Sequence, residues 1–385
     1  MRTSDFDAEY ANFRATVRAF ITAEVVPSFG KWYDDGLVPR EFYYRLGELG
    51  ILGLDMPVEY GGRGLGSFRY PAILAEEIAR AAVSFGGSSA HVSGCLPLLR
   101  DLATAAQRQR WLPEAVTGET MFALAVAEPG TGLEPAGMRT TAPLSLDGTE
   151  YVLNGSKTFV VGGVHADRVI VCARTAPPRV ADPDHGLSLL VIDAAAAGYR
   201  VARQLDTLGR KVSDTAELTF TDVRVPATDL LGTAHRGLAQ LAAQSTRERL
   251  SIAVRAYAQA DAAIRFARRH TTEHRAFTHT AANFQNTRFE LAACRAEVDA
   301  AAAVVDRAIT THDRGELSTA AAASAKLFCT EVAGRVIDRC LQLHGGMGHL
   351  ADSPIARLYA DHRIDRIQGG TSEVLRSVIA AEMGL

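Results

Sequence analysis

The spacing of apolar residues changes twice along this chain of 385 residues, and this constrains its fold more than any other feature. Apolar residues recur at helical spacing over 1–118, form short β-branched runs between about 121 and 225, and return to helical spacing after Gly232. A chain of this length exceeds what one ordinary hydrophobic core supports. We therefore expect a helical N-terminal domain at 1–118, a β-rich middle domain at 119–230 and a helical C-terminal bundle at 231–385.

Local signals refine the middle and C-terminal regions. The dipeptides Asp147-Gly148 and Asn154-Gly155 predict hairpin turns, because asparagine and glycine tolerate the positive φ that tight hairpins require. Six apolar residues of the C-terminal region are separated by steps of three and four, a spacing typical of a helix packed in a bundle. These residues are Leu291, Cys294, Val298, Ala301, Val305 and Ala308.

Composition excludes several classes of partner. With 41 lysines and arginines against 44 aspartates and glutamates, the formal net charge is -3, so no long-range field attracts nucleic acid or an anionic membrane. No window approaches the roughly 20 apolar residues of a membrane span, and the N-terminus lacks the apolar segment of a signal peptide. Five cysteines lie singly and 11 histidines form no metal-binding spacing. We expect a cytoplasmic protein with a small-molecule partner, without a metal and without nucleic-acid or membrane binding.

Three glycine-containing segments could contact a ligand, although each also has a purely structural interpretation. Ala127–Gly132 and Asn154–Gly163 combine strand sequence with glycines that let a ligand approach the backbone; by itself the first is more typical of a strand-ending loop, and the second is equally consistent with a structural hairpin. Gly369-Gly370-Thr371-Ser372 precedes a predicted helix and offers unpaired N–H groups to a polar ligand. The alternative is that Thr371 or Ser372 only caps that helix. Glycine patterns of Rossmann and P-loop enzymes are absent from the sequence.

The carboxylate of Glu248 is a candidate base only in its wider context. It lies between Arg247 and Arg249 near the start of a long predicted helix, and such a charged run is usually a solvated face with salt bridges.

Taken together, these motifs resemble those of the acyl-CoA dehydrogenase family, in the same order and over essentially the whole chain. The matching stretches are Ala127–Gly132, Leu153–Lys157, Val212–Glu217, Val223–Pro226, Arg275–Phe277, Phe284-Gln285, Leu343–Gly348 and Gly370–Glu373. The resemblance implies an α+β fold that is mainly α, with a helical N-terminal domain, a middle β-barrel domain and a C-terminal four-helix bundle. It also implies an FAD-binding homo-oligomer, usually a homotetramer.

The resemblance further implies roles for individual residues. Contacts to FAD across a subunit interface are expected from Arg275, Phe277 and Gln285. Their counterparts from the neighbouring chain are Gln342, Gly345 and Gly346. Two more residues, Thr371 and Glu373, match positions that contact the dinucleotide. The strand positions beside the flavin ring are Val126, Ala127, Phe159 and Val161. On the substrate side the resemblance places Leu133 and Arg249.

The most informative departure from the family pattern is Gly369. Many members carry the catalytic glutamate at that position, whereas the isovaleryl-CoA and long-chain branches carry it on the first helix of the C-terminal domain, in a sequence similar to Glu248-Arg249-Leu250. Glu248 is therefore predicted to abstract the α-proton of an acyl thioester, from a dry pocket in which desolvation raises its pKa. The N–H of Gly369 is predicted to bind the thioester carbonyl oxygen.

Further departures leave the carrier and the oxidant open. Family members commonly place threonines at Ala127 and Val161, and a serine is lost where this chain has Leu133. A substrate tethered to a carrier protein is thus an alternative to acyl-CoA, and a flavin monooxygenase or oxidase is an alternative activity. A flavin or thioester binder without catalysis is a third. The expected electron acceptor of the dehydrogenase is an electron-transfer flavoprotein.

Overall fold

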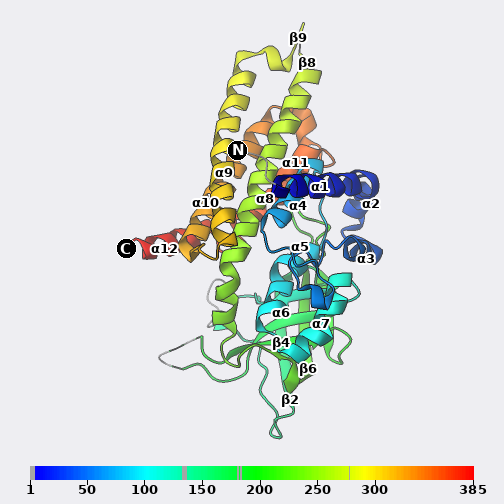
Figure 1. Ribbon diagram of the computed structural model, residues 1–385, viewed down its shortest axis with the longest axis vertical. Coiled ribbons are helices and arrows are strands. Elements are labelled where there is room, and N and C mark those ends of the chain that lie inside the picture. The colour runs from blue at the N-terminus through cyan, green and yellow to red at the C-terminus, as the bar shows by residue number, and fades with distance from the viewer. Residues whose placement is uncertain (1–4, 132–136, 180–181, 183, 277) are drawn as a thin grey trace.

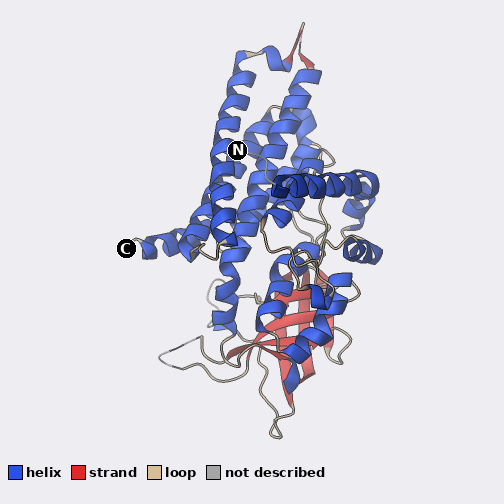
Figure 2. Ribbon diagram, in the orientation of Figure 1, coloured by secondary structure: helices blue, strands red, loops and turns tan. Residues whose placement is uncertain are grey.

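The computed structural model describes residues 5–131, 137–179, 182, 184–276 and 278–385. Its elements follow the predicted order of helices, strands and helices (Figures 1 and 2). The N-terminal helices are α1 (Asp5–Phe20), α2 (Val26–Asp35), α3 (Arg40–Glu48), α4 (Arg69–Ala81), α5 (Ser88–Ala90), α6 (Leu96–Leu102) and α7 (Ala105–Thr117). Helix α7 begins in a capping box, because Thr104 and Gln107 each bond the other's backbone N–H, and it ends at the left-handed Gly118.

Helix α1 is held on α4 by apolar packing and by one buried carboxylate. Phe13 and Val17, which the sequence places at helical spacing, are both buried in this core. Glu77 of α4 is 1% exposed and accepts hydrogen bonds from three arginines. These are Arg14, Arg18 and Arg80. Burial alone would raise the pKa of Glu77, but the arginines outweigh it and lower that pKa to about 2.

The strands of the middle region form two sheets around a shared core. They are β1 (Phe122–Ala125), β2 (Glu150–Val160), β3 (Arg168–Arg174), β4 (Leu187–Asp193), β5 (Tyr199–Gln204), β6 (Ala216–Pro226) and β7 (Leu230–Leu231). One sheet has the order β1-β3-β4-β7 and the other β2-β6-β5. Side chains of both sheets, among them Val169, Leu190 and Leu218, meet in one cluster. The two sheets therefore pack face to face around this cluster, as expected for a β-rich middle domain.

One of the two predicted hairpin turns is wrong. Gly148 has φ +74 in the turn before β2, as expected. Asn154 and Gly155 instead lie inside β2, where the register with β6 shifts between Leu153 and Gly155. A Cβ on Gly155 would lie 2.7 Å from the Cα of Thr140, so this glycine allows a bulge and a close backbone approach.

The C-terminal helices form an elongated bundle (Figure 1). They are α8 (Gly237–Glu273), α9 (Gln285–Asp313), α10 (Thr319–Gln342), α11 (Pro354–His362) and α12 (Ser372–Glu382). Between α8 and α9, the short strands β8 (Arg275–Ala276) and β9 (His279–Thr280) form a hairpin at one tip of the molecule, while α12 projects sideways from the other end of the bundle.

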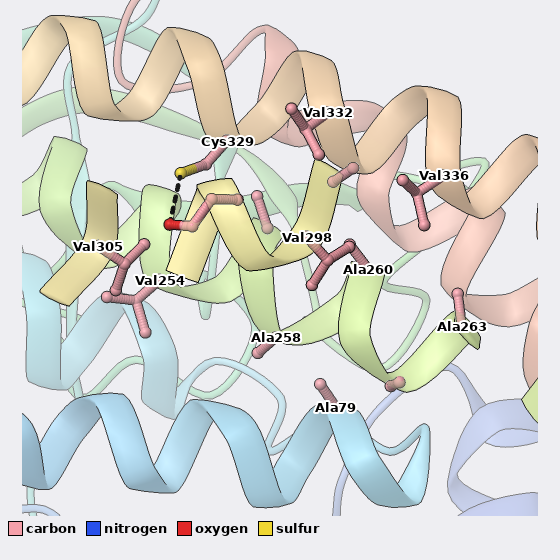
Figure 3. Packing of buried hydrophobic residues seen from close by; sticks show 14 of the residues in the cluster. Ala79, Val254, Ala258, Ala260, Ala263, Val298, Val305, Cys329, Val332 and Val336 are labelled. Carbon is pink, nitrogen blue, oxygen red and sulfur yellow. Dashed lines mark hydrogen bonds between the residues drawn. The ribbon is translucent and has the colours of Figure 1, made fainter. Parts of the chain in front are cut away.

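Small side chains let the bundle helices approach closely. Of the six residues predicted to form a seam, five are buried, and Leu291 packs at the edge of the core. Figure 3 shows Val298 and Val305 of α9 between residues of α8 and α10, with the thiol of Cys329 directed at the Ala301 carbonyl oxygen, 3.9 Å away. All five cysteines are free and buried. No described helix is long and apolar enough to cross a membrane, and no group of described residues could hold a metal ion.

Candidate active site

The side chain of Glu248 and the loop before α12 meet at one point. Glu248 lies on α8, one turn before Ile252, and the loop runs through Gly369 and Gly370 to Thr371. A Cβ placed on Gly369 would lie 3.7 Å from the Cδ and from Oε1 of Glu248, and 2.5 Å from Cδ1 of Ile252. The Glu248 carboxylate therefore occupies the space into which a side chain at position 369 would project. This contact brings together the two residues that the sequence singles out as catalytic.

The loop is fixed by side chains from two helices. Arg249 of α8 donates from Nε to the Gly369 carbonyl at 3.4 Å, and Lys326 of α10 donates from Nζ to the Gly370 carbonyl at 2.8 Å. Thr371 caps α12 by accepting from the Val374 N–H at 3.3 Å, and this side-chain role leaves its backbone N–H free for the predicted ligand contact. Arg249 thus contacts the loop that contains Gly369, and its buried Nη1 has no partner among the described residues.

The surroundings of Glu248 make its carboxylate a stronger base than an ordinary glutamate. Burial raises the pKa of Glu248, although Arg249, Arg255 and Lys326 act in the opposite direction. No described residue hydrogen-bonds or pairs with its carboxylate, and solvent still reaches the side chain. Glu248 is thus an exposed residue whose carboxylate is nevertheless partly desolvated by neighbouring protein atoms. The chain by itself does not form the dry pocket expected from the sequence, so exclusion of water from Glu248 requires a bound ligand.

A buried ionic cluster connects the surroundings of Glu248 to the middle region. Asp365 pairs with Arg255 of α8 at 2.7 Å and with Arg210, which precedes β6. Burial alone would raise the pKa of Asp365, but Arg210 and Arg255 outweigh it, so the carboxyl is held ionised. Arg210 Nη1 also donates to Gln368 Oε1 at 3.3 Å, directly before Gly369. The cluster therefore fixes the start of the loop that contains Gly369 relative to the strands.

The residues expected beside the flavin ring lie together where β1 and β2 end. The Ala127 carbonyl accepts the Thr158 N–H at 2.9 Å, which places the predicted positions 126 and 127 next to Phe159 and Val161. Phe159 is 67% exposed and has φ 55, a conformation rare for an aromatic residue. An exposed ring held in this way is a surface on which a planar ligand can stack.

Of the remaining predicted cofactor contacts, Glu373 lies in the first turn of α12, and the others that the structure describes lie at the hairpin tip of the bundle. Arg275 and Gln285 flank the hairpin and are exposed. Gln342, Gly345 and Gly346 lie at the same end, because the ring of the intervening His344 stacks on His270 of α8, with centroids 4.6 Å apart. Along α8 this tip is roughly 40 Å from Glu248, at about 1.5 Å per residue. Two further predicted residues, Leu133 and Phe277, lie outside the described residues.

Two hollows in the described part of the chain lie away from this site. One of about 220 Å³ is lined by residues of α1 and its neighbours, including Phe13 and Tyr70. The other, of about 330 Å³, lies between α10 and α11 and is lined by Arg335 and His362 among others. Neither of these two hollows includes Glu248 among its lining residues.

Comparison with known proteins decides the family. Models of the acyl-CoA dehydrogenase N-terminal, middle and C-terminal domains match residues 7–119, 123–223 and 235–384. The chain belongs to the acyl-CoA dehydrogenase family. It is 35% identical over 378 residues to a mitochondrial long-chain specific acyl-CoA dehydrogenase of Sus scrofa, which covers 98% of this chain and 87% of that protein. An acyl-CoA dehydrogenase structure from Geobacillus kaustophilus is 34% identical, with a TM-score of 0.93 over 98% of each chain.

Membership of the family confirms the predicted fold and the predicted type of enzyme. The chain is a flavoenzyme of the acyl-CoA dehydrogenase type, an oxidoreductase that acts on CH–CH bonds and binds FAD. A solved acyl-CoA dehydrogenase of Bacillus anthracis, in complex with FAD, is 29% identical, with a TM-score of 0.90 over 100% of this chain and 68% of that one. The monooxygenase alternative is not favoured.

The described residues fit an FAD. The N–H groups of Gly369, Gly370 and Thr371 have no acceptor within the described part of the chain, so three consecutive donors are available to an anionic or carbonyl group. The exposed ring of Phe159 offers a stacking surface for the isoalloxazine.

Prediction from the sequence missed the buried cations. Lys326 follows the alanine-rich start of α10 and lies on the same helix face as the buried Ala322 and Cys329. A lysine at such a seam position is a detectable signal, because an ammonium is rarely placed in a bundle core without a purpose. Arg210, Arg255 and Asp365 show no comparable local pattern in the sequence.

Proposed function

We propose that this protein dehydrogenates an acyl thioester to the 2-enoyl thioester, with Glu248 as the base that takes the α-proton. The supporting observation is the contact between Glu248 and position 369, since the carboxylate reaches the place where a loop glutamate would begin. A base on α8 can therefore serve the same reacting carbon as a base on the loop. Glycine at 369 leaves room for the thioester and keeps the backbone N–H as a donor.

The chain's own groups divide the work between proton transfer and charge stabilisation. Glu248 has its pKa raised by burial, which brings it closer to the working pH, as general base catalysis requires. As the α-proton leaves, negative charge develops on the thioester oxygen, and the free N–H groups of Gly369 and Gly370 are the available donors. When bound, FAD supplies the acceptor for the β-hydride at flavin N5.

We further propose that each FAD is held by two copies of the chain. Within one chain, Arg275 and Glu248 lie roughly 40 Å apart along α8, too far for both to serve one dinucleotide. The ring would lie against Val126, Ala127, Phe159 and Val161, and the dinucleotide near Thr371 and Glu373. The partner chain would add residues from its hairpin tip. This arrangement requires a homo-oligomer, for which a tetramer is the family expectation.

The carrier and the oxidant are also part of the proposal. We infer an acyl-CoA or carrier-protein thioester as substrate, with Arg249 and Leu133 on its path, and an electron-transfer flavoprotein as acceptor. A cytoplasmic location fits the sequence. The domain limits 1–118, 119–230 and 231–385 stay predictions.

Replacing Glu248 by glutamine tests the proposed base. Flavin reduction would be followed anaerobically with butyryl-, octanoyl- and palmitoyl-CoA and with a carrier-bound acyl group, which reports both chemistry and carrier. We expect the reduction rate of E248Q to fall by about 10²- to 10⁴-fold with FAD still bound, because glutamine cannot accept the proton. Protonation of Glu248 removes the base as the pH is lowered. Because the pKa of Glu248 is raised, the flavin-reduction rate of the wild type should begin to fall at a higher pH than it would with an ordinary glutamate as base.

The exposed Glu41 on α3 provides a control of the same charge change, and E41Q should reduce its flavin like the wild type. If E248Q keeps a wild-type reduction rate, the assignment of the base is wrong.

A further inference from the structure

Lys326 is a fully buried lysine without a carboxylate partner. In the described part of the chain only one other lysine is buried, and that residue, Lys157, pairs with Glu128 at 2.8 Å. Lys326 makes no ion pair within the described residues and donates its one side-chain hydrogen bond to the Gly370 carbonyl at 2.8 Å. Burying an unpaired ammonium is costly, so its partner in the loop that contains Gly369 calls for an explanation.

The charges around Lys326 come from two other elements. On α8, Glu248 acts on it as an anion, while Arg249 and Arg255 act as cations; after α11, Asp365 acts as a second anion. Burial lowers the pKa of Lys326 to about 8, although Asp365 and Glu248 oppose this. The Lys326 ammonium and the Glu248 carboxylate therefore each favour the charged form of the other.

The loop itself needs an external clamp. Gly369 and Gly370 have φ +66 and +98, and two consecutive glycines impose little conformation of their own. In a trans peptide the N–H points opposite to the C=O. With the Gly370 carbonyl bonded to Lys326, the Thr371 N–H must point away from that lysine, and with the Gly369 carbonyl bonded to Arg249, the Gly370 N–H points away from that arginine. Both N–H groups lack an acceptor within the described residues.

We propose that Lys326 is a positioning residue of the reaction, which clamps the Gly370 carbonyl and so holds the loop in the conformation in which the Gly369 and Gly370 N–H groups and the Glu248 carboxylate face the bound thioester. The inference rests on the proposed function and adds a residue to it. Its cation polarises the peptide that carries the Thr371 N–H, and it favours the charged form of Glu248 before substrate binds. Lys326 itself touches neither substrate nor reacting atoms.

Two substitutions separate the hydrogen bond from the charge. K326Q keeps an N–H donor near the Gly370 carbonyl but removes the cation, and K326M removes both. We expect the limiting rate of flavin reduction to fall by about 10- to 100-fold in K326M, as for a misplaced catalytic group, and less in K326Q. In both variants the acid limb of the pH–rate profile should move to higher pH, since losing a cation beside Glu248 makes that carboxylate easier to protonate.

Thr330 provides the matched control, because it is equally buried one turn further along α10 and its hydroxyl bonds only to carbonyls of its own helix. T330V should keep the wild-type acid limb. An unchanged limb and rate in both Lys326 variants would overturn the proposal, and so would failure of both to fold, because a loop clamp should be dispensable for folding. If E248Q remains active, the proposed function fails first; if E248Q is inactive while the Lys326 variants behave as wild type, only this inference fails.

Discussion

Replacing Gly369 by alanine should lower both the stability of the protein and its rate of flavin reduction, and a control glycine separates the two effects. At φ +66 a side chain costs about 1–2 kcal/mol, because left-handed backbone brings Cβ against the following carbonyl. The new methyl would also lie 2.5 Å from Cδ1 of Ile252, which must turn aside at a cost of about 0.5–1.5 kcal/mol. Together these terms predict a loss of about 1.5–3.5 kcal/mol in the free energy of unfolding.

The same methyl would lie 3.7 Å from Oε1 of Glu248, against the carboxylate that the proposed mechanism uses as its base. We therefore expect G369A to bind FAD but to reduce it about 10²-fold more slowly, since a displacement of about 1 Å can cost that much. Unfolding would be measured with urea, and reduction anaerobically by stopped flow.

Gly315 provides a close control for strain. It follows α9 with φ +73, and a Cβ there would meet nothing within 4 Å. G315A should lose about 1–2 kcal/mol of stability and no reduction rate. If G369A also keeps the wild-type rate, the thioester does not react beside position 369, and the reasoning that places the base is refuted.

Two further predictions concern subunit contacts and stability. Because Arg275 would serve the FAD of a partner, coexpressed R275A and E248Q chains should form mixed oligomers that regain flavin reduction, whereas each variant alone should not; a mixture without activity would contradict a shared site. E77Q should lose about 1–3 kcal/mol at neutral pH in urea unfolding, because three arginines lose a charged acceptor. Since the pKa of Glu77 is lowered to about 2, this difference should be full above the ordinary value of 4.5 and vanish as pH falls through about 2.

The spacing of apolar residues predicted the structure well for helices that bury one face. The seam of α9 is buried as expected, because steps of three and four place its apolar residues on one face. The error at Asn154-Gly155 has a physical cause. Glycine signals both tight turns and close backbone approaches, and only the packing of Thr140 against Gly155 tells the two apart. Local sequence does not contain that contact.

The candidate site was predictable only in part. Glu248 and Gly369 lie 121 positions apart in the sequence, and their juxtaposition follows from the family motif rather than from spacing. The surroundings of both residues also depend on Arg249, Arg255 and Lys326, whose effects on the Glu248 pKa arise from tertiary contacts. A charged residue within an alanine-rich helix shows that something is unusual at Lys326, but not which carbonyl it binds.

Under the proposed mechanism, the contact between α8 and the loop allows the base to belong to either element. A side chain at 369 would displace Ile252 and meet the Glu248 carboxylate, so two glutamates would compete for one space and repel each other. Glycine at 369 and glutamate at 248 therefore depend on each other. The loop without a side chain must still hold its N–H groups in place, and with two glycines it cannot do so alone. With Glu248 as the proposed base, the orientation of the loop depends on Arg249 and Lys326, whose side chains bind the Gly369 and Gly370 carbonyls.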